Sequence, residues 1–558
     1  MSATFLSRQA LLGAALSSVL LVGGCNNRGK SDAPEITVAA DSLELSGADE
    51  RALGEHFAVK PRGGSKADTL ALLTELQLDR MTDGRTVDGS TARWTDWRAE
   101  DGDAVVTADS VVLQGLHDTD AGPAADQLLA KGLRFESADE DGAEMLDMTV
   151  DELVIVEPSP SLLADLADIL AGREESRELT ERPEALADAQ NFRALRLVGL
   201  DGTAREDDQS GTFSIAQVVV GNDREAGRAD LVVESVDFNW SEDGAEDGFS
   251  LDMDGLTALG VDTSAGSPGL GVGGLLSGAT QFMTPGAAAP YRQVDLGTLS
   301  VTSRGFDLAM SGFEADSDTS GDVTTVRSVL SPMTLTLKEA FGGPVAPYFA
   351  ALQANGLSDI SLKGSQTAAF DRKADRVSVS DSQLEIDEGL RLDCDYAVRG
   401  LKAAEDAVAA SGATLPEPGA LDTEAKVDAY LTQLGAYQEA RAEASKLVKI
   451  EALACDVQDV ADNSLVTRGY AVAEAVTGKP VAVLKGGAKT MIALSSLTAQ
   501  NEFQRDLMDV VGTGLIDFID NPGQTMRVRV APEKPVSLTT LSGPDASLKP
   551  LGLSVTVE

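Results

Sequence analysis

Few side chains in this sequence have the type and spacing that catalysis or metal binding requires. The chain contains two histidines, His56 in GEHFAV and His117 in GLHDTD. Histidine is a common acid–base group and metal ligand, but these two lie far apart in the sequence and show no ligand spacing. We therefore expect both at surface or loop positions, and we predict no catalytic residue, no metal and no cofactor.

Three short motifs approach known ligand-binding patterns, and each departs from its pattern at a required position. GLGVGG at 269–274 has the glycine spacing of a dinucleotide-binding loop but follows a Ser-Pro pair instead of a strand. LKGGAKT at 484–490 lacks glycines that a phosphate-binding loop needs. DSDTSGD at 316–322 resembles the start of a calcium loop, but the twelfth position holds arginine instead of glutamate. We expect a hairpin tip there.

The most specific chemical signal lies at the N-terminus. A single charge, Arg8, precedes an apolar run at 10–22, and two glycines separate that run from Cys25. This order is typical of a secretion signal. The run is shorter than the roughly 20 residues that a permanent membrane-spanning helix needs. Val22-Gly23-Gly24-Cys25 resembles the lipobox of bacterial lipoproteins, although an ordinary signal peptide followed by a chance cysteine is the alternative.

The resemblance implies that residues 1–24 are removed and that a diacylglycerol is joined to the sulfur of Cys25. A thiolate is a good nucleophile for forming that thioether. Residues 25–36 would then be the lipidated cysteine and a solvated tether. In this family an aspartate after the cysteine often signals retention at the inner membrane. Asn26 therefore favours the outer membrane, on its periplasmic side or at the cell surface.

Cys394 and Cys455 are the two thiols that remain. They lie in the alternating segments GLRLDCDYAV and KIEALACDV, each on the apolar face. An exported protein meets an oxidising compartment, so we expect the two to pair if their strands are neighbours. The bond would close a loop of about 60 residues and add on the order of 4 kcal/mol. The alternative is two buried free thiols.

The chain is strongly acidic, with 90 Asp and Glu residues, 45 Lys and Arg residues and a formal net charge of −45. Nucleic-acid phosphates need a basic footprint, so we predict no nucleic-acid partner. Anionic headgroups would repel the body, so we expect membrane contact through the lipid anchor and not through a charged patch. An apolar content of 43% argues against wholesale disorder.

Alternating apolar and polar residues dominate 37–258, for example in AVVTADSVVLQGL and GTFSIAQVVVG. Such segments are typical of half-buried strands. Eight Asp-Gly pairs fall between Asp83 and Gly255, and this pair favours tight hairpin turns. We predict an antiparallel, β-rich N-terminal domain with many hairpins, interrupted by an amphipathic helix at 160–172.

Residues 259–292 are rich in Gly, Ala and Pro and predict a connection between two domains. Strand patterns resume in 293–558, where a helical insertion is predicted at about 402–447 and another helix at 498–520. The second domain is therefore expected to be mixed, with amphipathic helices, and the fold class as a whole α+β.

These expectations lead to three hypotheses about function. The first is a lipid-anchored envelope protein with a non-enzymatic structural or protein-interaction role. The second is a carrier or sensor of lipid or another apolar molecule, since long alternating strands with amphipathic helices loosely resemble β-groove proteins that handle envelope lipids. The third is a hydrolase of envelope polymer, which would need carboxylates or a Ser/His pair converging in a cleft.

Overall fold

The computed structural model divides the chain into two compact units, which are described separately. The described residues up to Arg304 form unit 1, and those from Gly305 form unit 2. The structure describes residues 49–101, 104–138, 144–170, 191–206, 209–223, 226–242, 248–262, 291–339, 348–413, 424–497, 502–537 and 547–558.

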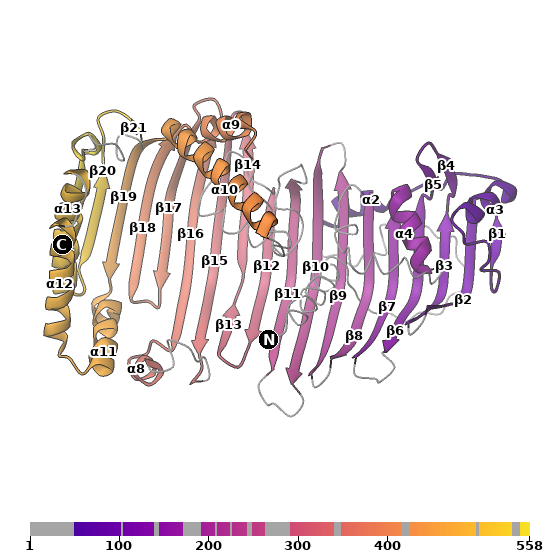
Figure 1. Cartoon of the computed structure of the whole chain (residues 1–558), viewed down its shortest axis with the longest axis horizontal. Coiled ribbons are helices and arrows are strands. Elements are labelled where there is room, and N and C mark those ends of the chain that lie inside the picture. Colours follow the sequence, from indigo (N-terminus) through magenta and orange to yellow (C-terminus); the bar gives the residue numbers. More distant parts are fainter. Residues whose placement is uncertain are drawn as a thin grey trace. The chain divides into compact units, whose positions relative to one another are not determined.

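Unit 1 is built on an antiparallel sheet in which the order of the strands follows the order of the chain (Figure 1). Each strand pairs with the next through a continuous antiparallel ladder. The strands are β1 (Thr86–Asp88), β2 (Thr91–Asp101), β3 (Ala104–Gln114), β6 (Gln127–Ala138), β7 (Glu144–Val156), β8 (Ala194–Glu206), β9 (Gln209–Asp223), β10 (Arg228–Glu242), β11 (Phe249–Asp262) and β12 (Gln293–Thr302).

Helices cover part of this sheet and supply its core. Leu53 and Phe57 of α2 (Asp49–Phe57) are buried against valines, leucines and alanines of β3, β6, β7, β8 and β9. In β9 the consecutive residues Val218, Val219 and Val220 are all buried, so both faces of the strand are covered at this point. The remaining elements are α3 (Lys66–Glu75), α4 (Pro160–Leu170) and a separate two-stranded ribbon of β4 (His117–Thr119) and β5 (Gly122–Ala124).

Unit 2 also contains an antiparallel sheet. β13 and β14 both pair with β15, the ladder continues through β16, β17, β18 and β19, and β19 pairs with both β20 and β21. β22 pairs with β20. The strands are β13 (Phe306–Met310), β14 (Phe313–Ser320), β15 (Val323–Leu337), β16 (Asp359–Asp371), β17 (Arg376–Ile386), β18 (Leu390–Arg399), β19 (Lys449–Asp459), β20 (Thr525–Val530), β21 (Val536–Ser537) and β22 (Leu553–Val557).

Apart from α8, which lies between β15 and β16, the described helices of unit 2 form two groups. α9 and α10 are inserted between β18 and β19, and α11, α12 and α13 between β19 and β20. α13 packs on β20 and β22, and α12 packs on α13 (Figure 1). The helices are α8 (Phe349–Ala354), α9 (Leu401–Ser411), α10 (Glu424–Ala444), α11 (Leu465–Thr477), α12 (Val481–Leu497) and α13 (Glu502–Asp520), with 3₁₀ turns at Ser445–Leu447, Ala461–Asn463 and Lys549–Leu551. Among the described helices, none is both long enough and apolar enough to cross a membrane.

The predicted α+β class is confirmed: unit 1 is mainly antiparallel sheet, and unit 2 mixes helices with strands. The division between the units falls after Arg304 and not inside 259–292. The reason is that β12, which the sequence assigned to the second domain, continues the sheet of unit 1 by pairing with β11 from Gln293 to Thr302. Residues 1–48, which include the predicted signal and tether, lie outside the described residues.

One local prediction needs correction. Asp201-Gly202 and Asp254-Gly255, expected in hairpin turns, lie inside β8 and β11. LKGGAKT, which departs from the phosphate-binding loop pattern in sequence, lies in the interior of α12. A helix interior has its backbone N–H groups paired with its own carbonyls, so it offers no cradle for a phosphate.

Candidate functional site

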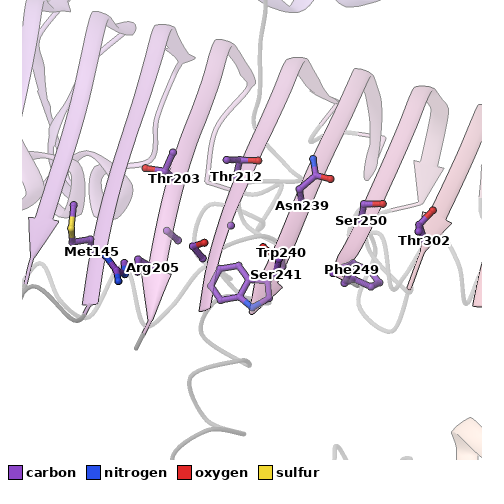
Figure 2. Close-up of a pocket in the computed structure, with 14 residues that line it drawn as sticks. Met145, Thr203, Arg205, Thr212, Asn239, Trp240, Ser241, Phe249, Ser250 and Thr302 are labelled. Atoms are coloured by element: carbon purple, nitrogen blue, oxygen red, sulfur yellow. The ribbon is translucent and has the colours of Figure 1, made fainter. Parts of the chain in front are cut away.

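A hollow of about 700 Å³ lies at the ends of strands β7 to β12 in unit 1 (Figure 2). The strands that form it are consecutive in the sheet, so the register of their ladders fixes which side chains share a face. The hollow is lined by Met145, Thr203, Ala204, Arg205, Ser210, Gly211, Thr212, Asn239, Trp240, Ser241, Gly248, Phe249, Ser250 and Thr302.

Much of this lining consists of two cross-strand rows on one face of the sheet. The first row is formed by residues that are directly opposite one another on successive strands, and Figure 2 shows them in line: Thr203, Thr212, Asn239, Ser250 and Thr302. The second row lies two residues nearer the strand ends and contains Met145, Arg205, Ser210 and Ser241. Residues two apart along a strand point to the same side, so both rows face the same way.

The side chains of these rows are polar and uncharged except for the cationic Arg205 and the apolar Met145. Serine and threonine hydroxyls both donate and accept hydrogen bonds, and the Asn239 carboxamide does both through separate atoms. Thr203, Thr212 and Asn239 are exposed. The two polar rows, which form the bed of the hollow, therefore offer hydrogen-bonding groups. A partner with its own donors and acceptors can pair with them.

The row between these two projects from the opposite face and is stiffened by aromatic rings. Trp240 is directly paired with Gly211, and a β-carbon added to Gly211 would overlap the indole ring. Phe213 covers Gly202 in the same way. Aromatic side chains that cover a cross-strand glycine stabilise a sheet where the glycine itself adds nothing.

Further contacts fix these rings. Phe238 stacks on Trp240 with ring centroids 6.3 Å apart, and it meets Phe249 edge-on at 5.9 Å. The indole Nε1 of Trp240 donates a hydrogen bond to Oε1 of Gln209 over 3.0 Å. The aromatic cluster thus holds the backbone of β9, β10 and β11 at the point where their other face carries the polar rows.

A row of carboxylates borders the hollow on the side towards the middle of the strands. It contains Asp201, Asp237 and Asp252, aligned by pairing through Ser214 of β9. A hydrogen bond with Asp237 raises the pKa of Asp252 above its ordinary value, helped by burial and by the charges of Asp237 and Asp254. Burial, with the charge of Asp151, raises the pKa of Asp201.

The cysteines predicted to be exported with the body lie in unit 2. Cys394 of β18 and Cys455 of β19 are directly opposite one another, with Cα atoms 4.2 Å apart, and a disulfide joins them. The bond encloses the chain that forms α9 and α10. Cys25, the predicted lipidation site, lies outside the described residues.

The two histidines, expected at surface or loop positions, are partly buried and lie in a helix and a strand. His56 of α2 packs on Gly221, and burial lowers the pKa of its imidazole. His117 of β4 donates from Nδ1 to the carbonyl of Gly115 over 2.8 Å and accepts at Nε2 from Arg62. Neither residue lines the hollow.

The other chemical motifs can be placed only in part. DSDTSGD forms the end of β14 and the turn into β15, where Ser320 pairs with Val323, as expected for a hairpin tip. GLGVGG lies outside the described residues. Within the residues that the structure covers, no group of three or more His, Cys, Asp or Glu side chains is arranged to hold a metal ion.

Sequence reasoning did not find the hollow. Its polar residues are mostly serines, threonines and one asparagine, many of them in the segments GLDGTARE, QSGTF and DFNWSE, which by themselves indicate only the exposed positions of strands. They become a site because neighbouring strands place them in register. The alternation in each segment predicts which residues share a face, but the pairing partners are set by the tertiary structure.

Comparison with known proteins adds little to this geometry. A family model described as an uncharacterized protein matches residues 384–558, less than a third of the chain. The match begins within β17 and covers the disulfide and all the helices from α9 onwards. No significant match is found among curated proteins.

Proposed function

We propose that this protein is an exported lipoprotein of the bacterial cell envelope whose folded body binds a partner and catalyses no reaction. The segment from Val22 to Cys25, which resembles a lipobox, supports an anchor of acyl chains on the Cys25 sulfur. Two or more acyl chains give stable attachment, whereas one chain gives marginal and reversible binding. Asn26 favours the outer membrane as the site of attachment.

The binding part of the proposal depends on the hollow in unit 1. Its bed presents the hydroxyls of Thr203, Thr212 and Ser250 beside the carboxamide of Asn239. Such groups suit a protein segment, whose main chain and polar side chains need both donors and acceptors. The carboxylate of Asp237 lies next to this bed, and the chain has a net charge of −45. We therefore expect a partner with a neutral or basic surface.

A second function, the carriage of a lipid or another apolar molecule, is favoured by two side chains that line the hollow from opposite faces of the sheet. Met145 is 46% exposed and Phe249 is 39% exposed, although both are large and apolar. Exposed apolar groups beside a hollow are typical of ligand contacts. The polar rows favour the protein partner over this alternative because they would stay unpaired beneath an acyl chain.

The anchor is tested by labelling cells with radioactive palmitate. We expect label in the wild-type protein and none in the Cys25→Ala variant. Retention of residues 1–24 in the purified protein, or the absence of acyl groups from it, would remove the lipoprotein part of the proposal.

The hollow is tested by placing a photo-crosslinking amino acid at Asn239 in the intact, lipidated protein. The matched control is the same amino acid at Gln383, another exposed strand carboxamide that lies in unit 2. We expect protein adducts from position 239 and not from 383. A lipid adduct, together with co-purified lipid in native mass spectrometry, would support the carrier instead. Equal adducts at both positions would contradict a binding role for the hollow.

A further inference from the structure

Helix α12 has an unusual position for its composition. Its sequence, VAVLKGGAKTMIALSSL, contains two lysines and no acidic residue. The wider segment 475–501 has three lysines and no Asp or Glu, in a chain with 90 acidic residues. Such an apolar helix is usually buried, yet α12 packs mainly on α13 and α11.

One side of α12 is fully used in packing on α13. Lys485 donates from Nζ to the carbonyl of Ile519 over 2.7 Å, and Lys489 forms an ion pair with Asp520. Ile492 lies so close to Gly512 that a β-carbon on that glycine would be 2.8 Å from the Ile492 side chain. Residues 485, 489 and 492 follow helical spacing, so they define the face of α12 that is turned towards α13.

The opposite side of α12 is apolar and exposed. Val483 is 56% exposed, Leu494 50% and Met491 74%, the highest value for a large apolar side chain among the described residues. Gly486 and Gly487 lie on this side too, with no heavy atom within 4 Å of an added β-carbon. The exposed face is thus a mainly apolar stripe along the helix, with Thr490 within it and the small residue Ala482 at its border.

We propose that the exposed face of α12, formed by Val483, Met491 and Leu494, lies on the surface of a lipid bilayer. An interfacial helix buries one apolar face at the level of the headgroups and the first acyl carbons, and it needs no groove to receive it. The absence of acidic side chains along 475–501 removes the repulsion that anionic headgroups exert on the rest of the body. This inference rests on the proposed function, because lipid on Cys25 would hold the body beside a membrane.

A protein partner fits this face less well. A stable protein interface buries roughly 800 Å² on each side and has a polar rim. The exposed part of α12 is a single narrow stripe. Its polar side chain is Thr490, which supplies one hydroxyl group and no polar rim. A second copy of the chain packed through Gly486 and Gly487 is the strongest competing occupant, and the test distinguishes it.

The test uses the chain from Asn26 to Glu558, which contains both units and lacks the lipidated cysteine. Any binding to vesicles then comes from the folded body. It is mixed with neutral phosphatidylcholine vesicles at physiological salt, and the bound fraction is measured by flotation. The variant is Met491→Asp, and the matched control is Leu431→Asp, at a side chain of α10 that is 56% exposed. Circular dichroism checks that both variants fold.

We expect the wild-type body to float with the vesicles, Met491→Asp to lower the bound fraction about tenfold, and Leu431→Asp to leave it unchanged. No flotation of the wild-type body, or equal loss in both variants, would overturn the inference. A wild-type dimer in sedimentation that Met491→Asp converts to a monomer, without vesicle binding, would assign the face to a second copy. Palmitate labelling of Cys25 is scored separately, so failure of the α12 contact and failure of the lipid anchor are distinguished.

Discussion

Trp240 and Gly211 form a cross-strand pair in which the indole occupies the space that any β-carbon at position 211 would need. Both residues line the hollow, in the row that lies between the two polar rows and projects from the opposite face of the sheet. A small substitution at Gly211 should therefore change both the stability of unit 1 and the shape of the hollow.

We predict that Gly211→Ala destabilises unit 1 by about 1–3 kcal/mol, because the added methyl forces the indole out of place. Denaturant unfolding and near-ultraviolet circular dichroism measure the effect. The matched control is Gly486→Ala in α12, where an added β-carbon meets nothing within 4 Å. That change should stabilise the helix by about 0.5–1 kcal/mol. Equal effects of the two substitutions would contradict the packing described for Trp240.

The disulfide between Cys394 and Cys455 should contribute on the order of 4 kcal/mol, because it closes a loop with a sequence separation of 61. We predict that the double variant Cys394→Ala/Cys455→Ala unfolds at lower denaturant concentration than the wild type. A reductant should shift the wild-type midpoint towards that of the variant and leave the variant unchanged. If reductant does not change the unfolding midpoint of the wild type, the disulfide adds no stability.

The Asp237–Asp252 pair predicts a pH dependence in unit 1. The pKa of Asp252 is raised above its usual value of 3.8 by its hydrogen bond with Asp237 and by burial. Because the pKa of Asp252 is higher in the folded state, the unfolded chain loses this proton at a lower pH than the folded protein does. The stability from the shared proton is therefore present below the usual aspartate pKa and is lost as pH rises through the raised value.

The Asp252→Asn variant has no carboxylate at this position, so it should not lose this stability as pH rises. Relative to the wild type, its free energy of unfolding should therefore increase from pH 4 to pH 7, a range of about three units that spans ordinary carboxylate titration. Denaturant unfolding at several pH values measures it. Asp120→Asn, at an exposed position in the turn between β4 and β5, is the control and should follow the wild type. A wild-type slope unchanged in Asp252→Asn would disprove the shared proton.

The insertion of α9 and α10 should be separable from the sheet of unit 2. Arg399 and Lys449, which flank it, are directly paired at the ends of β18 and β19. Within its described part, Ala444 and Val448 are the buried residues. Replacing residues 400–448 by Asn-Gly, which favours a two-residue hairpin turn, should cost about 1–2 kcal/mol and still allow the disulfide to form. An Ala-Ala turn is the control and should be less stable, because it resists positive φ.

The sequence predicted the elements of this fold better than their assembly. Period-two alternation correctly indicated the long strands, and the apolar stripes indicated α4 and α13, because a segment that buries one face repeats its apolar residues at the period of its structure. The stripe of α10 also indicated a helix, although its Leu431 is 56% exposed. The helix α12 was not predicted. Gly486 and Gly487 disfavour a helix in isolation, and contacts with α13 through Lys485, Lys489 and Ile492 stabilise it.

The pairing of strands with one another could not be predicted from the sequence. Nothing local in QVDLGTLSVT shows that β12 pairs with β11, so the boundary between the units was placed before it. The alignment of Thr212, Asn239 and Ser250 depends on two separate ladders in the same way. Local pattern constrains each strand, whereas the candidate site is a property of several strands in register.

The sheet of unit 1 has a consequence for how the protein is made. From β6 to β12 each strand pairs with the strand that follows it in the chain, up to the pairing of β11 with β12. A polypeptide that emerges N-terminus first, from a ribosome or a translocation pore, can therefore add one strand at a time to a growing edge. The loop closures are short except between β7 and β8 and between β11 and β12. Each partly formed sheet ends in an unpaired edge strand. A chaperone that holds the growing chain would therefore need to cover mainly this strand.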